Sequence, residues 1–193
     1  MTTLHEKFDI QESEYVFPYH YIPHFDCHGV PMRSQTLGWG FDYLCYLKHI
    51  ASLVLERNPS SVLDVGCGDG RFLGLLEGTV FRKVGCDLSA KAISFAKAFN
   101  QDIEYLPFDA KALTEEFDIV TAIEVLEHIP DEQVPSFIRT LYDRTEMGGE
   151  IIICVPSTQL KLQGKHYRHY DEGLLDKHIQ SAGVHLKKRK EFR

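Results

Sequence analysis

The chain has 193 residues, of which 44% are hydrophobic and 25% are charged. These values are ordinary for a single globular domain and exclude a fibrous or disordered chain. The formal net charge of −7 argues against nucleic acid as a partner, because surfaces that bind phosphate backbones are usually basic. The apolar runs fall short of the roughly 20 residues that cross a bilayer, so we expect no membrane partner.

The N-terminus and the cysteines predict the compartment. Residues 1–5 lack the basic and apolar segments of a secretory signal. The five cysteines include no Cys-x-x-Cys pair, and Cys67, Cys86 and Cys154 lie in apolar runs that we interpret as strands. Buried, reduced thiols of this kind are typical of a reducing compartment. The sequence therefore predicts a cytoplasmic protein.

Residues 1–34 are predicted to be an aromatic-rich N-terminal segment that precedes one domain spanning residues 35–193. Positions 15–25 hold five aromatic residues and two prolines. Proline disfavours a regular helix or a central strand, so we expect this stretch to be extended over the domain. It could cover a ligand as a lid, or it could only cover the flank of the sheet.

The rest of the chain alternates between helix and strand patterns. Apolar residues at helical spacing predict a helix over 36–57, which Asn58-Pro59 ends. Near-continuous apolar runs are typical of strands that are covered on both faces. We therefore expect a doubly wound α/β fold, with a mostly parallel sheet and helices on both faces. Its strands are predicted at about 61–65, 82–87, 102–106, 117–123 and 149–155, and its further helices at about 70–77, 90–98, 131–144 and 171–182.

A strand, a glycine-rich turn and a helix follow one another around residues 64–70. Gly66, Gly68 and Gly70 allow positive φ angles and the close approach of a ligand to the backbone. The helix behind the turn offers free N–H groups. The third glycine comes one residue too early for the dinucleotide-binding pattern. Alone, the turn is equally compatible with a ligand site and with a structural role.

Acidic residues at the ends of later strands favour the ligand site. Asp87 lies about 20 residues after the turn, where nucleotide-binding folds hold ribose hydroxyls, although it could also cap a helix. Asp109 could accept a hydrogen bond from an adenine amine while Ala110 leaves room for a flat ring, or it could be a turn residue. Glu124 and His128 follow the fourth strand, at the edge of the sheet where ligands bind.

Taken together, four stretches resemble the ordered motifs of class I S-adenosylmethionine-dependent methyltransferases, over about residues 61–183. They are VLDVGCGDG at 62–70, GCDLS at 85–89, EVLEHIPD at 124–131 and GGEIII at 148–153. The resemblance implies a Rossmann-like fold, S-adenosylmethionine as cofactor and methyl transfer as activity. It implies that Asp64 and the glycines hold the methionine and ribose, that Asp87 binds the ribose, and that Glu124 lines the methionine end. The expected cofactor contacts are Asp64, Gly66, Cys67, Gly68, Gly70, Asp87, Leu88, Asp109, Ala110 and Glu124.

The catalytic residues are predicted from the chemistry of the acceptor. The cofactor's methyl group is already activated, so the enzyme must align a nucleophile and exclude water. A base is needed only when the acceptor is protonated, and His128 is the candidate because imidazole titrates near neutrality. It could instead orient its loop. A His-, Tyr- and Arg-rich loop after the fifth strand suits a polar acceptor, although its side chains could also only pack together. The predicted catalytic residues are His128, His166 and His169, and the predicted acceptor contacts are Tyr19, Tyr21, Arg168 and Tyr170.

The predicted function is O-methylation of a small-molecule acceptor such as a sugar, a phenol or another metabolite. One alternative is metal-dependent RNA 2′-O-methylation, because Glu124, Glu127, His128 and His166 resemble the metal-binding motif of small-RNA 3′-end methyltransferases. The same Glu-x-x-Glu-His pattern occurs in metal-free relatives, including ubiquinone-pathway-like O-methyltransferases, so we predict no metal. A further alternative is a non-catalytic, methyltransferase-like binding subunit, against which the intact glycine turn and Asp87 argue.

The end of the chain departs from the family pattern. Residues 184–192 are predicted to form a sixth strand, whereas class I domains generally add an antiparallel seventh strand. The sequence leaves three readings open: a truncated chain, a sheet that is one strand short, or a partner chain that fills the position. An oligomer is therefore compatible with the sequence.

Overall fold

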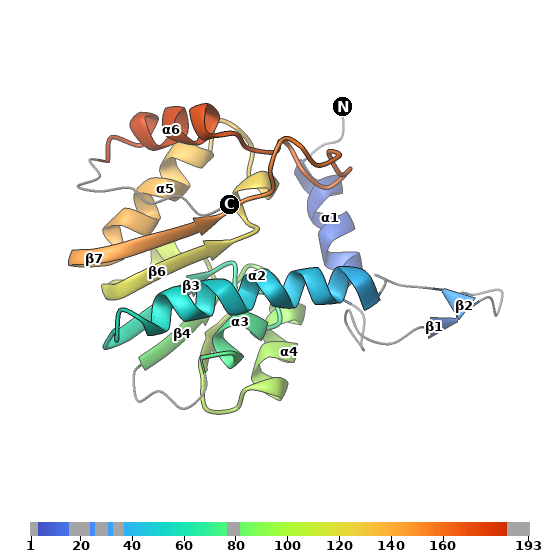
Figure 1. The fold of residues 1–193 in the computed structure, drawn as a ribbon, viewed down its shortest axis with the longest axis horizontal. Helices are drawn as coiled ribbons and strands as arrows, with labels where there is room; N and C mark the ends of the chain where they lie inside the picture. The colour runs from blue at the N-terminus through green and yellow to red at the C-terminus, as the bar shows by residue number, and fades with distance from the viewer. Residues whose placement is uncertain (1–3, 16–23, 26–30, 33–36, 77–81, 185–193) are drawn as a thin grey trace.

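The computed structural model describes residues 4–15, 24–25, 31–32, 37–76 and 82–184. Helices and strands alternate along most of this part of the chain (Figure 1). Its elements are α1 (Leu4–Glu14), β1 (His24–Phe25), β2 (Pro31–Met32), α2 (Leu37–Leu55), β3 (Ser61–Val65), α3 (Arg71–Gly74), β4 (Arg82–Cys86), α4 (Ala90–Phe99), β5 (Glu104–Leu106), η1 (Ala110–Ala112), β6 (Phe117–Ile123), η2 (Leu126–His128), α5 (Val134–Asp143), β7 (Thr145–Cys154) and α6 (Glu172–Ser181).

Five strands form a parallel sheet in the order β5-β4-β3-β6-β7. The chain builds outward from β3 through β4 to β5, and then crosses to the other side of β3 to form β6 and β7. The carboxyl ends of β3 and β6 therefore adjoin where the winding direction reverses, which is the usual position of ligands in open α/β sheets. The predicted doubly wound α/β fold is confirmed.

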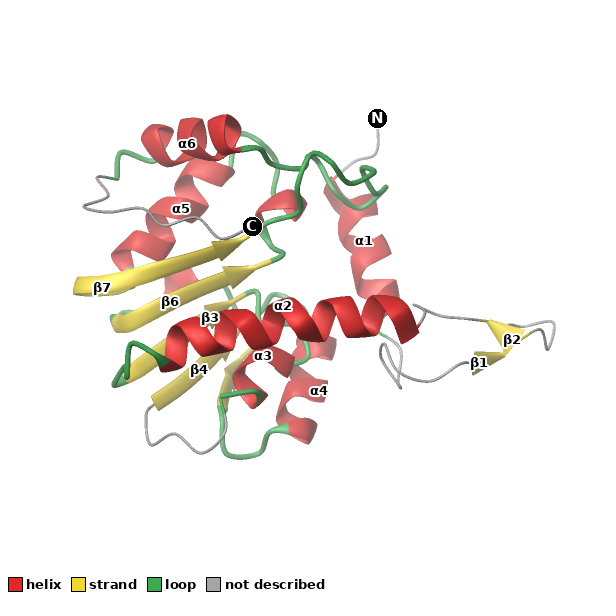
Figure 2. Cartoon of the chain, in the orientation of Figure 1, coloured by secondary structure: helices red, strands yellow, loops and turns green. Residues whose placement is uncertain are grey.

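Helices cover both faces of this sheet (Figure 2). On one face, apolar side chains of α5 and α6 pack with the strands into one buried cluster. On the other face, α2, α3 and α4 pack against the strands in a second cluster. The strands β3, β5, β6 and β7 contribute alternate side chains to the two clusters, as Val62 and Leu63 do on β3. Burial on both faces explains the near-continuous apolar runs of the sequence.

Two differences from the predicted elements bear on the site. The strand β7 begins at Thr145, a few residues before its predicted start, and pairs with β6 through a register shift near Phe117. The helix α1 lies in the N-terminal segment 1–34, before the aromatic stretch and in a part for which we made no prediction, and Figure 1 shows it beyond the ends of the strands to which the arrowheads point. Of the predicted sixth strand at 184–192, only the buried Val184 belongs to the described residues. No described helix is both long and apolar enough to cross a membrane.

Candidate active site

The glycine turn is a tight junction between β3, β4 and the segment after β6. The N–H groups of Gly66 and Cys67 both donate to the Cys86 carbonyl, at 2.8 and 3.1 Å. Gly66, Gly68 and Gly70 have φ angles of 78°, 53° and 75°, which residues with a Cβ rarely adopt. A Cβ on Gly66 would lie 2.5 Å from Val125 Cγ2. The turn therefore requires glycine at position 66.

Asp87 connects the glycine turn to the end of β4. Its partly buried carboxylate accepts hydrogen bonds from Gly68 N–H at 2.9 Å and from Ser89 N–H at 2.8 Å. Burial raises the pKa of Asp87, and both backbone hydrogen bonds act in the opposite direction. Each carboxylate oxygen can accept a further hydrogen bond, so Asp87 can still bind a pair of ribose hydroxyls. Asp87, the predicted ribose contact, thus lies beside the glycine turn.

Asp64 is a buried carboxylate on β3 at the base of this junction. Thr121 Oγ1 on β6 donates a hydrogen bond to Asp64 Oδ1 at 2.6 Å. Burial raises the pKa of Asp64 to about 7, while the hydrogen bond from Thr121 opposes the rise. A positively charged ligand group beside Asp64 would stabilise its ionised form. This property suits the cationic methionine end of S-adenosylmethionine.

The predicted adenine contacts lie around the ends of β4 and β5. Asp109 caps η1 by accepting a hydrogen bond from Lys111 N–H at 2.9 Å, and Ala110 is buried beneath it. Leu88, directly after Asp87, leaves 64% of its surface exposed. An exposed apolar side chain next to Asp87, the predicted ribose contact, could provide a surface for a flat aromatic ring. The donor and acceptor groups around the turn therefore fit S-adenosylmethionine, although the individual contacts remain predictions.

Glu124 ends β6 with a strained backbone. Its φ angle is 56°, a left-handed conformation that is uncommon for a residue with a long side chain. Its N–H donates to the Cys154 carbonyl at 2.9 Å, which fixes it to β7. Burial raises the pKa of Glu124 to about 7. The strained position places an acidic group next to Val125, whose side chain packs on Gly66.

Three histidines gather beyond Glu124. The rings of His128 and His166 meet edge to face, with centroids 4.7 Å apart. His166 Nδ1 lies 2.8 Å from His169 Nε2. Burial lowers the pKa of His128 to about 4 and that of His166 to about 3, so both rings are neutral at physiological pH. The structure therefore brings together the three residues that the sequence predicted to be catalytic.

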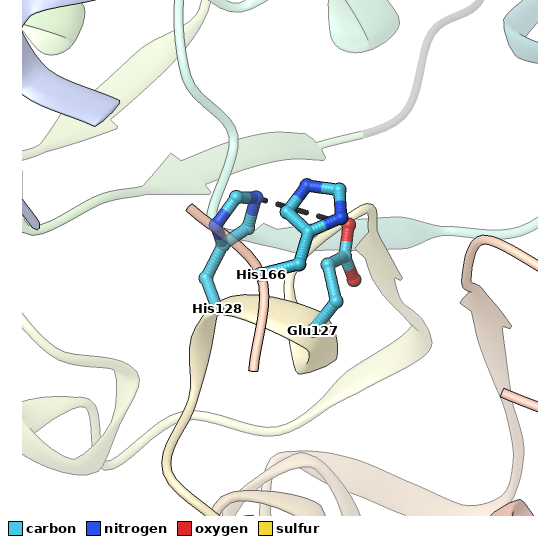
Figure 3. Close-up of side chains that lie close together, drawn as sticks. All are labelled: Glu127, His128 and His166. Carbon is cyan, nitrogen blue, oxygen red and sulfur yellow. Dashed lines mark ion pairs between the residues drawn. The ribbon is translucent and has the colours of Figure 1, made fainter. Parts of the chain in front are cut away.

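Glu127 is a part of this cluster to which the sequence analysis gave no role in the predicted reaction. It lies on η2 with a fully buried side chain. Its Oε1 is 3.8 Å from His128 Nε2, and Figure 3 shows both side chains converging with that of His166. Burial raises the pKa of Glu127 to about 8, and the charge of Glu124 adds to the rise.

Arg168 and Tyr170, the two predicted acceptor contacts in the same loop, contact other parts of the protein. The Arg168 guanidinium donates to the Leu126 and Ile129 carbonyls and pairs with Asp131. The ring of Tyr170 is buried in the core cluster beside α5 and α6. These contacts match the packing alternative for the loop, and an acceptor role for Arg168 or Tyr170 stays a prediction. Tyr19 and Tyr21 lie outside the described residues.

The helix α1 lies between the glycine turn and the loop that carries His166 and His169. This contact was not predicted from the sequence. Lys7 Nζ donates to the carbonyls of Gly164 and His166, at 2.8 and 2.9 Å. Glu14 accepts from Lys165 at 2.6 Å. Tyr15, directly after α1, is buried with its hydroxyl 3.3 Å from the position of a Cβ on Gly68. The contact depends on charged residues that are far apart in the sequence. A single sequence does not show which of its charged residues pair with each other.

Comparison with known proteins identifies the family. Residues 39–188 match the family described as a methyltransferase domain, and this region is more than half of the chain. The chain belongs to this family. The predicted resemblance to class I methyltransferases is therefore confirmed, together with S-adenosylmethionine as their cofactor.

Curated relatives match a shorter region. The chain is 36% identical over 98 residues to the ubiquinone biosynthesis O-methyltransferase of Pseudomonas entomophila, and 37% identical over 101 residues to that of Pseudomonas putida. Each match covers 47% of this chain and 41% of the relative. The aligned region thus spans less than half of the curated relatives that it matches.

Solved structures agree with the fold. DesVI of Streptomyces venezuelae is similar with a TM-score of 0.56 and 25% identity, over 66% of this chain and 57% of that one. The magnesium protoporphyrin IX methyltransferase of Synechocystis PCC 6803, solved with bound SAH, has a TM-score of 0.62 and 19% identity, over 73% of each chain. At this identity, the second similarity concerns the fold alone.

Proposed function

We propose that this chain transfers the methyl group of S-adenosylmethionine to an oxygen of a small-molecule acceptor. One observation carries the proposal: a glycine turn with buried carboxylates and a cluster of three imidazoles lie at the same edge of the sheet. The O-methyltransferase names of the curated relatives support oxygen as the acceptor atom. The net charge of −7 favours a small acceptor over RNA.

The cofactor would be held between the turn and the two acidic strand ends. The backbone of Gly66 and Gly68 would approach the methionine part, Asp87 would bind the ribose hydroxyls, and ionised Asp64 would face the cationic end. S-adenosylmethionine supplies an electrophilic methyl group on a sulfonium. The protein then has to hold the acceptor oxygen in line with that methyl group and keep water out.

His128 is the residue that we assign to proton removal. Its neutral ring can take the acceptor's hydroxyl proton as the oxygen forms its bond to the methyl carbon, while the carbon–sulfur electron pair stays on sulfur. The resulting imidazolium would favour ionisation of Glu127, 3.8 Å from His128 Nε2, and the two opposite charges would then stabilise each other. His166 and His169 would position the acceptor from the opposite side of the cluster. A hydroxyl that is already acidic, such as that of a phenol or a catechol, suits a base whose pKa is lowered.

A mass-spectrometric assay tests the proposal. The protein would be incubated with S-adenosylmethionine and separate panels of phenols, sugars and short RNAs with a free 3′ end. We expect a gain of one methyl group on a phenol or sugar and formation of S-adenosylhomocysteine, and both should fall sharply in His128→Gln. Methylation of RNA alone would replace the small-molecule proposal. If calorimetry detects S-adenosylhomocysteine binding but every panel stays unmethylated, the non-catalytic binding role is favoured instead.

A further inference from the structure

The carboxylate of Glu127 is buried without a hydrogen-bond partner. Its side chain is fully buried, and neither carboxylate oxygen has a hydrogen-bond partner among the described residues. Burying an ionisable group without hydrogen bonds costs several kcal/mol, so such groups are normally paired or coordinate a metal. Because this free-energy cost is high, we expect a bound group other than the protein chain to contact the Glu127 carboxylate.

The cations that act on Glu127 are bound elsewhere. The charges of Lys165 and Arg168 both influence its carboxyl group. Lys165, however, forms an ion pair with Glu14 at 2.6 Å. Arg168 is bound to the Leu126 and Ile129 carbonyls and to Asp131. Neither side chain supplies the missing partner.

Two imidazole rings face the same point as this carboxylate. One ligand atom from each of Glu127, His128 and His166 lies within 4.8 Å of the other two. Figure 3 shows that the three side chains come from two segments, η2 and the later loop, and converge. Ligands of one tetrahedral zinc ion lie about 3.3–3.6 Å apart, given bonds of roughly 2.0–2.2 Å. An ion would therefore draw the most distant of these atoms together by at most about 1.5 Å.

The hydrogen bonds of His169 determine the tautomer of His166. His169 Nδ1 lies 3.2 Å from the Leu160 carbonyl oxygen, which can only accept, so Nδ1 carries the proton. In a neutral ring His169 Nε2 is then an acceptor, and His166 Nδ1, 2.8 Å away, donates to it. The lone pair of His166 is consequently on Nε2. Metal-binding histidines are oriented in this manner by a partner on their other nitrogen.

We propose that Glu127, His128 and His166 bind a divalent transition-metal ion of the zinc type. Two imidazoles and one carboxylate, with a position left open, form a donor set of catalytic zinc sites. Nitrogen donors favour such ions over Mg²⁺ and Ca²⁺, which prefer oxygen ligands. The prediction of no metal from the sequence had no means of detecting the unpaired carboxylate or the His169 contact.

The open position also bears on the acceptor, in a step that rests on the proposed function. The ion would be bound by Glu127, three residues after Glu124, which is predicted to line the methionine end of the cofactor. An acceptor hydroxyl bound at the open position would be acidified by the ion. With His128 bound to the ion, the ion would take over the promotion of proton loss, and the acceptor would release its proton to water as it binds, before the site excludes water for methyl transfer.

Cobalt absorption tests the metal site without any methyl-transfer assay. Chelator-treated protein would be titrated with Co²⁺ and its visible absorption followed, and Zn²⁺ would then be added as a competitor. We expect one Co²⁺ per chain, displaced by Zn²⁺ but not by Mg²⁺. Glu127→Gln should weaken Co²⁺ binding by more than about 100-fold, beyond the effect of losing an outer partner. His5→Gln, which alters an exposed histidine paired with Asp9, should leave it unchanged.

Two further measurements make the result decisive. His169→Leu should weaken Co²⁺ binding by about 10- to 100-fold, while His169→Gln, whose amide oxygen can still accept from His166, should restore most of it. S-adenosylhomocysteine binding, measured by calorimetry, should persist in Glu127→Gln and shows that the variant is folded. The metal proposal is overturned if the unchanged chain binds S-adenosylhomocysteine but gives no Co²⁺ absorption, or if Glu127→Gln binds Co²⁺ equally well. Loss of methyl transfer alone would concern only the proposed function.

Discussion

The Lys165 ammonium lies 2.6 Å from the Glu14 carboxylate, so the N-terminal helix is tied to the loop that carries His166. Lys7 reinforces this contact by donating to two carbonyls of the same loop. The buried Tyr15, directly after α1, lies beside Gly68 of the glycine turn. One helix therefore spans the two halves of the site.

Removing this connection should loosen the histidine loop. In a Lys7→Met, Glu14→Gln variant, we expect faster amide hydrogen exchange at residues 163–166, because the loop loses two hydrogen bonds and a partly buried ion pair. Exchange in β3 and β6 should not change. Arg139→Gln, which removes an exposed ion pair with Asp143 on α5, is the control. Equal exchange in the loop before and after the change would show that α1 does not hold it.

The glycine turn should tolerate no side chain at Gly66. We expect Gly66→Ala to lower the free energy of unfolding by about 1–3 kcal/mol, because the residue needs a φ angle of 78° and its Cβ would collide with Val125. Calorimetry should also show loss of S-adenosylhomocysteine binding. Gly173→Ala offers a matched control, since its Cβ would meet Asp171 Oδ1 only at 3.6 Å. An unchanged affinity for S-adenosylhomocysteine in Gly66→Ala would contradict a cofactor role for the turn.

The sequence was sufficient to predict the fold and the cofactor half of the site. The strands are buried on both faces, so their apolar runs mark them clearly, and β3 and β6 were predicted at their observed positions. Asp64, the glycines and Asp87 follow strand ends in chain order. Their approach in space is a direct consequence of parallel pairing, as the Asp64–Gly85 register shows.

The acceptor half depends on contacts that a single sequence does not contain. Arg168 was predicted to bind substrate because exposed cations in loops often do, yet it is buried against η2. Glu127 entered the sequence analysis only through the metal alternative, because only the three-dimensional structure shows that its carboxylate lacks hydrogen bonds. The contact of α1 joins residues more than 150 positions apart, and no local pattern signals it.

Arg168 should prove to be a structural residue of η2. We expect Arg168→Met to lower the free energy of unfolding by about 2–3 kcal/mol, because the Leu126 and Ile129 carbonyls would lose their donor. Arg139→Met removes an exposed arginine with an i,i+4 ion pair and should change stability by less than about 0.5 kcal/mol. Urea unfolding of both variants makes the comparison. An Arg168→Met protein of normal stability that binds acceptor weakly would instead support the acceptor role.

Asp64 should make stability depend on pH. Its pKa is about 7 in the folded chain, against 3.8 for an unperturbed carboxyl group. Below about pH 4 the group is protonated in both states and imposes no penalty. As pH rises from about 4 to 7, the unfolded chain loses this proton while the folded chain retains it, so the free energy of unfolding falls. Above about pH 7 the penalty is constant, at no more than about 4 kcal/mol.

Asp64→Asn isolates this effect from that of neighbouring carboxyls. Asp69, whose pKa burial raises to about 6, and Asp87 also titrate with raised pKa values, so the unchanged chain reports a sum. The asparagine oxygen can still accept the hydrogen bond from Thr121, but it carries no charge. Urea unfolding between about pH 4 and 8 should therefore show a flatter profile and higher stability at pH 8 for the variant. The same variant should bind S-adenosylhomocysteine less tightly at pH 8, because the ammonium group of that ligand would lose its counter-charge. A variant that gains stability but keeps its affinity would place the cationic end of the cofactor away from Asp64.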